Sequence, residues 1–418
     1  MNKKLIFKFD KEFIVFITVV YYTSKLLWDN MIPYMFTLGY IALSGFFFMK
    51  YIQKLNKKKL LLCIYFVIFA TYIIMNAYFK DNLSQLYRAV YEYIIYALPF
   101  FLLIYCMPYV NVERLSEKIV KWGLVLGILS WYEYFTKSYI LNIHSDNTGI
   151  LYGGSYAFRA AVFARSELAQ GVILGFFTVI AFSLYMRLRK KKYLFYMFFL
   201  FASILTTSSR GPLVATLAAI LTIYMLNIIL VEHSSSKKII STFGITLGCI
   251  AIMFVLLSDF QTNNEAVNYF LLRIRNILNW DSDAGNVGRI SRWKWALMLY
   301  KSNPFWGIGP SKTGSWGIGS LGVTESGVLK RLCELGIFGF CMHYFFVSII
   351  LIKSVGAIAK MNRINKISVI MFIGILTIII VNDFILQSTE EPSVCFIMWF
   401  SIAGLISYVF ARREWIGE

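Results

Sequence analysis

The sequence predicts an all-α integral membrane protein with about twelve transmembrane helices. Of its 418 residues, 58% are hydrophobic and only 15% are charged, and the mean hydropathy is +0.65. A soluble domain does not need so much apolar surface, so repeated crossing of a bilayer is the expected arrangement. Backbone groups inside lipid must be hydrogen-bonded within their own segment, which makes the apolar segments helices.

Twelve apolar segments are long enough, or nearly long enough, to cross a hydrocarbon core of roughly 30 Å. The seventh is short and lies close to the eighth. The segments lie near residues 13–29, 32–49, 60–79, 89–110, 117–136, 167–187, 193–208, 211–231, 239–258, 326–352, 366–386 and 393–411.

The basic residues predict how these segments are oriented. The net charge is +19, and most Lys and Arg residues lie in short clusters between every second pair of apolar segments. This alternation requires an even number of spans and places both termini in the cytoplasm. The basic start is followed by an apolar run without a small-residue cleavage site, so we expect a retained first span. Residues 1–418 are then one polytopic domain with two sizeable extracytoplasmic loops, 137–166 and 259–325.

Several arginines lie outside the predicted cytoplasmic clusters of basic residues. These exceptions to the positive-inside rule indicate an anionic ligand. Arg159 and Arg165 lie in the first outer loop, and Arg210 lies at the turn before the eighth span. Guanidinium groups bind phosphate bidentately. The alternatives are pairing with acidic residues or with phospholipid headgroups. For Arg210 the acidic partners would be Glu325, Glu390 or Glu391.

The second outer loop contains a predicted amphipathic helix, RISRWKWALMLYKS, that begins at Arg289. Ile290, Trp293, Leu297 and Tyr300 share one face at a spacing of three to four residues. Arg289 and Arg292 are candidate ligands for phosphate or for an acidic glycan. Trp293 is either a stacking platform for a sugar or an interfacial anchor.

The starts of the later helices carry the remaining candidates. Ser166 is expected to cap the sixth span, with Glu167 in its first turn. Glu325 lies just before the tenth span and is either a simple first-turn carboxylate or the general base that activates a sugar hydroxyl. Gly336 and Gly339 are expected to serve helix packing.

The remaining observations concern cysteines and histidines, one local ion pair and known catalytic motifs. The six cysteines include no CxxC pair and there are only three histidines, so neither a disulfide framework nor a metal site is expected. Glu92 follows Arg88 by four residues, a spacing typical of a local ion pair. No nucleotide-binding or hydrolase motif lies in a suitable context, and we expect no cofactor and no nucleic-acid partner.

Four segments together resemble the Wzy-type O-antigen and capsular polysaccharide polymerases and the related O-antigen ligases. The resemblance covers roughly residues 150–352. The matching segments are FRAAVF around Arg159, LTTSSRGPLVA around Arg210, RISRWKWALMLYKSNPFWGIGPS from Arg289, and TESGVLKRLCELGIFG from Thr324.

The resemblance implies a metal-independent, GT-C-like glycosyltransferase in a bacterial cell membrane. Such an enzyme takes a glycan from undecaprenyl diphosphate and passes it to the sugar end of another lipid-linked repeat unit. Arg159, Arg165, Arg210, Arg289 and Arg292 would then bind diphosphate and acidic glycan. Among them, Arg210 would stabilise the leaving group directly. A chain-length regulator and a flippase are possible partners.

Three alternatives stay open at this point. In ligase relatives a His-Asn pair precedes the ELG-type helix, where this chain has Glu325-Ser326. That difference favours a polymerase and leaves the base undecided. A flippase of lipid-linked oligosaccharides would carry its charges inside the helical bundle, whereas these charges gather at the outer boundary. A non-catalytic partner subunit is the third alternative.

Overall fold

The computed structural model describes residues 10–31, 35–52, 57–80, 83–141, 150–152, 155–232, 244, 284–314 and 321–411. These residues are helical apart from short connections and one small antiparallel hairpin, β1 (Ile150–Tyr152) with β2 (Ser155–Ala157). The fold class predicted from hydropathy, an all-α integral membrane protein, is therefore confirmed.

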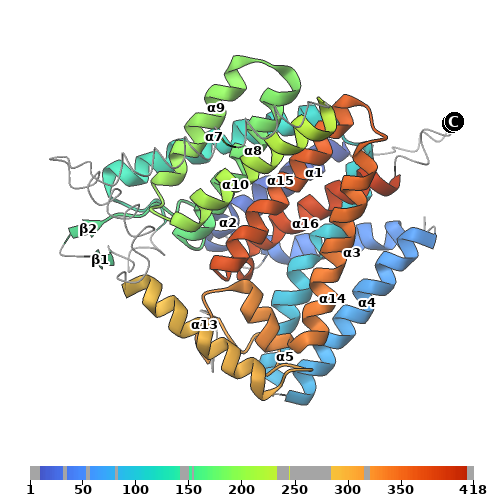
Figure 1. Ribbon diagram of the computed structural model, residues 1–418, viewed down its shortest axis with the longest axis vertical. Helices are drawn as coiled ribbons and strands as arrows, with labels where there is room; N and C mark the ends of the chain where they lie inside the picture. The colour runs from blue at the N-terminus through green and yellow to red at the C-terminus, as the bar shows by residue number, and fades with distance from the viewer. Residues whose placement is uncertain are drawn as a thin grey trace.

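The chain up to Thr136 forms the blue to teal helices of Figure 1. They are α1 (Lys11–Thr23), α2 (Lys25–Met31), α3 (Met35–Ile52), α4 (Lys57–Lys80), α5 (Leu83–Ala89), α6 (Pro99–Cys106) and α7 (Val112–Thr136). A π-helical turn, η1 (Val90–Ile94), and a 3-10 turn, η2 (Ile95–Ala97), join α5 to α6.

The chain after Thr136 contains α8 (Glu167–Leu188), α9 (Lys191–Leu205), α10 (Arg210–Leu226), α13 (Ala284–Ser302), α14 (Gly327–Ile358), α15 (Arg363–Ile385) and α16 (Pro392–Ile406). Short π-helical turns extend α10 as η5 (Asn227–Val231) and α16 as η7 (Ser407–Ala411), and the 3-10 turn η6 (Ser388–Glu390) precedes α16. Helix α13 includes the predicted amphipathic helix and begins five residues earlier.

Seven helices in the described part of the chain are long and apolar enough to cross a membrane. They cover Leu61–Lys80, Leu86–Tyr109, Glu167–Leu188, Arg210–Val231, Gly327–Ile358, Arg363–Ile385 and Pro392–Val409. Four other predicted spans coincide with shorter or more polar helices, at α1 with α2, α3, α7 and α9. The predicted span at 239–258 lies outside the described residues, so the number twelve stays a prediction.

The core is formed by α8, α10, α15 and α16, which lie side by side in the middle of Figure 1. Glycines allow these helices to approach closely, as is common in membrane bundles. A Cβ atom at Gly374 in α15 would lie 2.5 Å from the side chain of Ile223 in α10. Helix α8 is almost entirely buried, from Ala169 to Met186.

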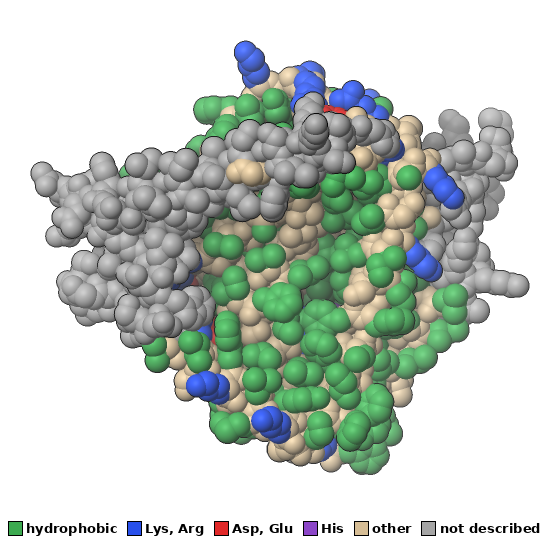
Figure 2. All heavy atoms as spheres, viewed as in Figure 1, with side chains coloured by type: hydrophobic (Ala, Val, Ile, Leu, Met, Phe, Trp, Pro, Cys, Tyr) green, Lys and Arg blue, Asp and Glu red, His purple; other side chains and the backbone are tan. Residues whose placement is uncertain are grey.

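The basic ends of the predicted cytoplasmic loops gather at one end of the bundle. Arg187 at the end of α8 lies 2.9 Å from Glu113 at the start of α7. Lys366 near the start of α15 donates to the carbonyl of Leu230 at 2.9 Å. Figure 2 shows hydrophobic side chains over the middle of one face, with most Lys and Arg side chains toward its top and bottom. This distribution fits a bilayer-spanning body.

Helix α14 is broken at Gly336, which adopts φ +62°. The segment NPFWGIG, residues 303–309, pairs with the break. The amides of Ile308 and Gly309 donate to the carbonyls of Cys333 and Glu334 at 2.8 and 3.0 Å. On the far side of the break, the amide of Ile337 donates to Pro304 at 2.8 Å.

The expectation that Gly336 serves helix packing was therefore wrong. Its left-handed backbone opens the helix so that freed carbonyls and amides bind the loop. Gly339, by contrast, packs as expected, because a Cβ atom there would lie 2.6 Å from the ring of Tyr72.

We predict that Gly336→Ala destabilises the protein by more than about 2 kcal/mol, since an L-residue at this φ is strained and its Cβ would overlap the loop backbone. Gly356→Ala in the same helix is the matched control, because no atom lies within 4 Å of a Cβ there. Thermal unfolding in detergent should show a lower Tm for the first variant alone. Equal midpoints would contradict the role given to Gly336.

Candidate functional site

Three of the predicted arginines lie around the N-terminal ends of α8 and α10, and we call Arg159, Arg165 and Arg210 the arginine cluster. Arg159 donates from Nε to the carbonyl of Thr207 at 3.1 Å and from a terminal nitrogen to Ser209 Oγ at 2.8 Å. It therefore lies directly beside Arg210, the first residue of α10. Arg165 immediately precedes the cap of α8. That these arginines act together on one ligand stays a prediction.

The acidic residue Glu133 holds the segment that carries Arg159 and Arg165. It is fully buried in α7, and its carboxylate accepts the amides of Ala161 and Val162, both at 2.9 Å. A buried carboxylate is tolerated when backbone N–H groups bind it in this way. Val162 adopts φ +50°, a strained conformation for a β-branched residue. This contact fixes the segment before α8 against the bundle.

The predicted cap of α8 is present, and it connects to acidic neighbours. Ser166 Oγ accepts the amide of Ala169 at 3.2 Å. Glu167 in the first turn lies 3.9 Å from Arg159, so one arginine of the cluster has an internal carboxylate close by. Arg159 therefore connects the segment before α8 to the segment before α10 by hydrogen bonds, and its positive charge lies near the surface.

The other predicted residues meet at Glu325. Arg292 from α13 forms an ion pair and hydrogen bond with its carboxylate, and Arg289 lies 3.8 Å away. The indole of Trp293 donates to the Glu325 backbone carbonyl at 3.1 Å. Glu325 itself adopts φ +54°, and strained non-glycine residues of this kind tend to occur at functional sites. We call these four residues the Glu325 site.

Leu386, the residue that follows α15, lies between the start of α10 and the start of α14. The amide of Gly327, at the start of α14, donates to the carbonyl of Leu386 at 3.1 Å. On the other side, a Cβ atom at Gly211 in α10 would lie 2.7 Å from Leu386 Cδ1. Leu386 therefore separates the first turns of α10 and α14, and with them Arg210 and Glu325.

Four helices present their N-terminal ends to this region: α8, α10, α14 and α16. Ser166 at the start of α8 lies 3.4 Å from Glu391, the residue before α16. Helix N-termini carry partial positive charge and favour anions. The end of the bundle opposite the basic loops is therefore suited to a phosphate-bearing ligand.

A buried network around Lys330 was not predicted from the sequence. Lys330 is 3% exposed; its ammonium lies 2.8 Å from Glu92 and 3.8 Å from Glu334 and pairs closely with Glu390. It also donates to the carbonyl of Thr313 at 3.0 Å. The predicted local pair of Arg88 with Glu92 was wrong, because Glu92 turns to Lys330 and to Ser311 instead.

Glu334 fastens the glycine-rich loop to this network. It is fully buried and accepts the backbone amides of Ser311 and Thr313, both at 2.8 Å. The hydroxyl of Tyr93 donates to the same carboxylate at 2.6 Å. Loop residues 311–313 are thus held by α14 on one side and by η1 on the other.

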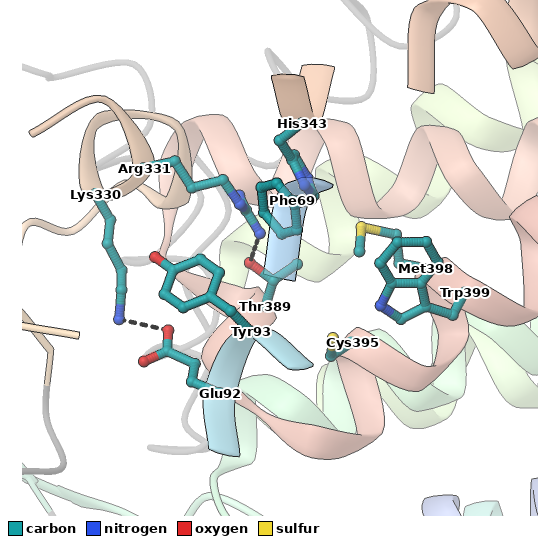
Figure 3. A pocket seen from close by; sticks show the side chains of 10 residues that line it. All are labelled: Phe69, Glu92, Tyr93, Lys330, Arg331, His343, Thr389, Cys395, Met398 and Trp399. Atoms are coloured by element: carbon teal, nitrogen blue, oxygen red, sulfur yellow. Dashed lines mark hydrogen bonds and ion pairs between the residues drawn. The ribbon is translucent and has the colours of Figure 1, made fainter. Parts of the chain in front are cut away.

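Arg331 continues the network toward a small cavity of about 30 Å³, shown in Figure 3. It binds Asp383 and Thr389 and donates to the hydroxyl of Tyr344 at 3.1 Å. The cavity walls also include Glu92, Tyr93, Lys330 and His343. Charged residues inside apolar spans usually mark a functional or structural site, and that signal could have identified this network from the sequence.

Glu391 was considered from the sequence only as a possible partner of Arg210. It is 7% exposed, and one of its two carboxylate oxygens is buried without a hydrogen-bond partner. Burial raises the pKa of Glu391 to about 7, although the charge of Arg165 acts in the opposite direction.

The described residues contain no group of three side chains suited to hold a metal ion. What they do offer is electrostatic: cations and helix N-termini at one end of the bundle, with carboxylates close beside them. Such a site can bind a diphosphate and stabilise it as it departs, and a carboxylate nearby can accept a proton.

We predict that Lys330→Met destabilises the protein by about 3–5 kcal/mol, because it leaves the buried carboxylates of Glu334 and Glu390 and the partly buried one of Glu92 without their shared cation. Lys301→Met on the exposed part of α13 is the control. Adding Glu390→Gln to Lys330→Met should restore part of the loss in thermal unfolding. A loss no larger than that of the control would show that the network contributes little.

We also predict a pH-dependent effect of Glu391→Gln on stability. The pKa of Glu391 in the fold is raised from 4.5 to about 7, so its contribution to stability falls as pH rises through that window. The loss is on the order of 3 kcal/mol when complete. The variant should therefore unfold at a higher temperature than wild type at pH 8 and at a similar one at pH 4.5. The same difference at both pH values would refute this assignment.

Residues 195–344 match the family model described as O-antigen ligase, which is about a third of the 418 residues. The match includes Arg210, α13, the NPFWGIG segment and the break in α14. No curated protein matches the chain. Residues 195–344 are thus similar to the O-antigen ligase family, and this likeness is consistent with a polysaccharide-related membrane enzyme of the O-antigen ligase and Wzy-like superfamily.

Proposed function

We propose that this protein is a polysaccharide repeat-unit polymerase. It transfers a glycan from undecaprenyl diphosphate to the sugar end of another lipid-linked repeat unit. The observation that carries the proposal is that Leu386 contacts both Gly211, next to Arg210, and Gly327, two residues after Glu325. One side offers cations for a diphosphate, and the other offers a carboxylate for a hydroxyl.

The arginine cluster holds the leaving group. As the bond between the anomeric carbon and the diphosphate oxygen breaks, its electron pair stays on the diphosphate. Arg210 stands at the first turn of α10, where guanidinium and helix dipole act on the same charge. Stabilising charge that develops during the reaction lowers the barrier directly.

The Glu325 site receives the acceptor. The hydroxyl of the acceptor sugar attacks the anomeric carbon, and its proton passes to the Glu325 carboxylate. In the structure this carboxylate is engaged by Arg292 and Arg289, so an acidic or hydroxyl-rich glycan would first displace an arginine. Trp293 is fixed by its hydrogen bond to the Glu325 backbone, and its ring would stack on the sugar.

The site is assigned to the extracytoplasmic side of a bacterial cell membrane, with both termini in the cytoplasm. The basic loops at the opposite end of the bundle support this orientation. The reaction needs no metal, because the arginines and helix termini supply the positive charge. A flippase and a chain-length regulator are the expected partners in the membrane.

Two alternatives have specific support. A ligase is favoured by the description of the matched family, whereas Glu325-Ser326 stands in place of the His-Asn pair of the ligases. A flippase is favoured by the charges around Lys330 inside the bundle. Those charges pair with each other and hold loop residues 311–313, beside a cavity of only about 30 Å³. That arrangement supports a role in holding the loop more than a role as a passage for a lipid-linked oligosaccharide.

We predict that purified wild-type protein with a lipid-linked repeat unit forms a ladder of products. Arg210→Ala and Glu325→Gln should each lower the rate by at least about 100-fold, since each removes a charge that acts on the transition state. Lys301→Ala, which removes a basic residue from the exposed end of α13, should keep the ladder.

Gel analysis of the glycan products checks this outcome. A folded wild-type protein that makes no ladder but moves the same lipid across liposomes would replace the polymerase proposal with the flippase. Transfer of a single glycan to a non-repeating lipid acceptor, without a ladder, would favour the ligase.

A further inference from the structure

Two aromatic side chains of the NPFWGIG segment lie on the outside of the molecule. Phe305 is 60% exposed and Trp306 is 57% exposed, whereas the residues that follow, 307–310, are buried. The ring of Phe338 in α14 is 49% exposed, and its centroid lies 6.0 Å from that of Phe305 and 5.4 Å from that of Trp306. We call these three rings the aromatic patch. An exposed apolar cluster of this kind marks a surface that binds an apolar partner.

The aromatic patch lies beside membrane-spanning helices, at some distance from their predicted outer ends. The ring of Trp306 stacks on Tyr72 of α4, with 5.9 Å between centroids. Tyr72 comes eight residues before Lys80, where α4 ends, so it lies about 12 Å from that end at 1.5 Å per residue. Both Tyr72 and Phe338 belong to helices that are long and apolar enough to cross a membrane. Because a hydrocarbon core is roughly 30 Å thick, Trp306 lies within its outer half.

The backbone of the segment meets the requirement for non-helical chain at this depth. Polar backbone groups inside the membrane must find partners within the protein. The carbonyl of Trp306 accepts from Asn76 Nδ2 of α4 at 2.7 Å, and the carbonyl of Phe305 accepts the amide of Phe338 at 3.4 Å. The amides of residues 307–309 also donate to protein carbonyls. A loop in water would not need to turn these groups inward while its largest apolar rings face outward.

Polar side chains lie immediately outside the aromatic patch. Lys80 Nζ donates to Asn303 Oδ1 at 2.9 Å in an exposed position, and Ser302 is exposed at the end of α13. The surface therefore changes from polar to apolar between Asn303 and Phe305. Figure 2 shows hydrophobic side chains, with a few Lys and Arg among them, over the end of this face where Figure 1 places α13 and α14. The aromatic patch thus continues the lipid-facing surface of α4 and α14.

We propose that the NPFWGIG segment is a re-entrant loop whose aromatic patch binds the acyl chains of the membrane, in the outer leaflet of the predicted topology. Phe305 and Trp306 enter the hydrocarbon, whereas Asn303 and Lys80 stay at the level of the lipid headgroups. The loop thereby anchors the end of α13 to the membrane and sets the height of the Glu325 site above it. This role goes beyond the proposed function and does not depend on which reaction the site catalyses.

The test is tryptophan fluorescence of the full-length protein in liposomes of phosphatidylcholine that carries bromine, a short-range quencher, on its acyl chains. The contribution of Trp306 is the difference between wild type and Trp306→Phe. This contribution should be quenched by the brominated chains and left unchanged by iodide in the water. Trp295→Phe is the matched comparison, because the Trp295 ring in α13 lies 3.5 Å from a Cβ atom placed at Gly322, in the loop before α14. The contribution of Trp295 should not respond to the brominated chains.

A pair of cysteine variants gives a second measurement that does not depend on tryptophan. Phe305→Cys and Ser302→Cys are treated with a charged maleimide supplied on both sides of the liposomes, and labelling is measured above that of the parent protein. The thiolate is the reactive form and hydrocarbon disfavours it, so Phe305→Cys should react at least about tenfold more slowly than Ser302→Cys.

Three results would overturn the proposal: equal labelling of the two cysteine variants, quenching of Trp306 by iodide, or quenching of Trp295 by brominated chains as strong as that of Trp306. Neither measurement uses a glycan substrate. Failure of the polymerase assay would therefore leave the re-entrant loop in place, and failure of the lipid assays would leave the polymerase proposal in place.

Discussion

The pairing of the NPFWGIG segment with the break in α14 is the contact on which the candidate site depends. A helix that continued through Gly336 would satisfy its own carbonyls and leave the loop without a partner. With the break, Cys333 and Glu334 accept amides from the loop, and Pro304 accepts one from beyond the break. The loop is then attached to the membrane core at both ends of the interruption.

This attachment fixes α13 and the entrance of α14 relative to each other. The buried carboxylate of Glu334 and the ammonium of Lys330 extend the contact to residues 311–313. Arg289 and Arg292 lie in α13, before the loop in the sequence, and Glu325 lies after the loop, just before α14. Their ion pairs therefore join two segments whose spacing is already set by backbone hydrogen bonds.

The charge distribution separates two tasks. Inside the bundle, Lys330 and Arg331 are matched by carboxylates, and removal of one partner would leave an expensive buried charge. At the end of the bundle, the arginines lie beside helix N-termini and at partly exposed positions. The inner charges contribute rigidity, whereas the outer ones remain within reach of a ligand. Glu391 lies between the two groups, and burial raises its pKa to about 7.

Local chemistry in the sequence was sufficient for the all-α class, the cap at Ser166 and the α13 helix. Hydropathy, capping and helical spacing act over a few residues, so the sequence alone determined them. The tertiary structure decided that Glu92 binds Lys330 rather than Arg88, that Gly336 breaks α14, and that Leu386 separates Arg210 from Glu325. These outcomes depend on contacts between segments more than a hundred residues apart, or on a loop that competes with a helix for its own backbone groups. Such competition is settled by packing and by the cost of buried charge, which no local pattern records.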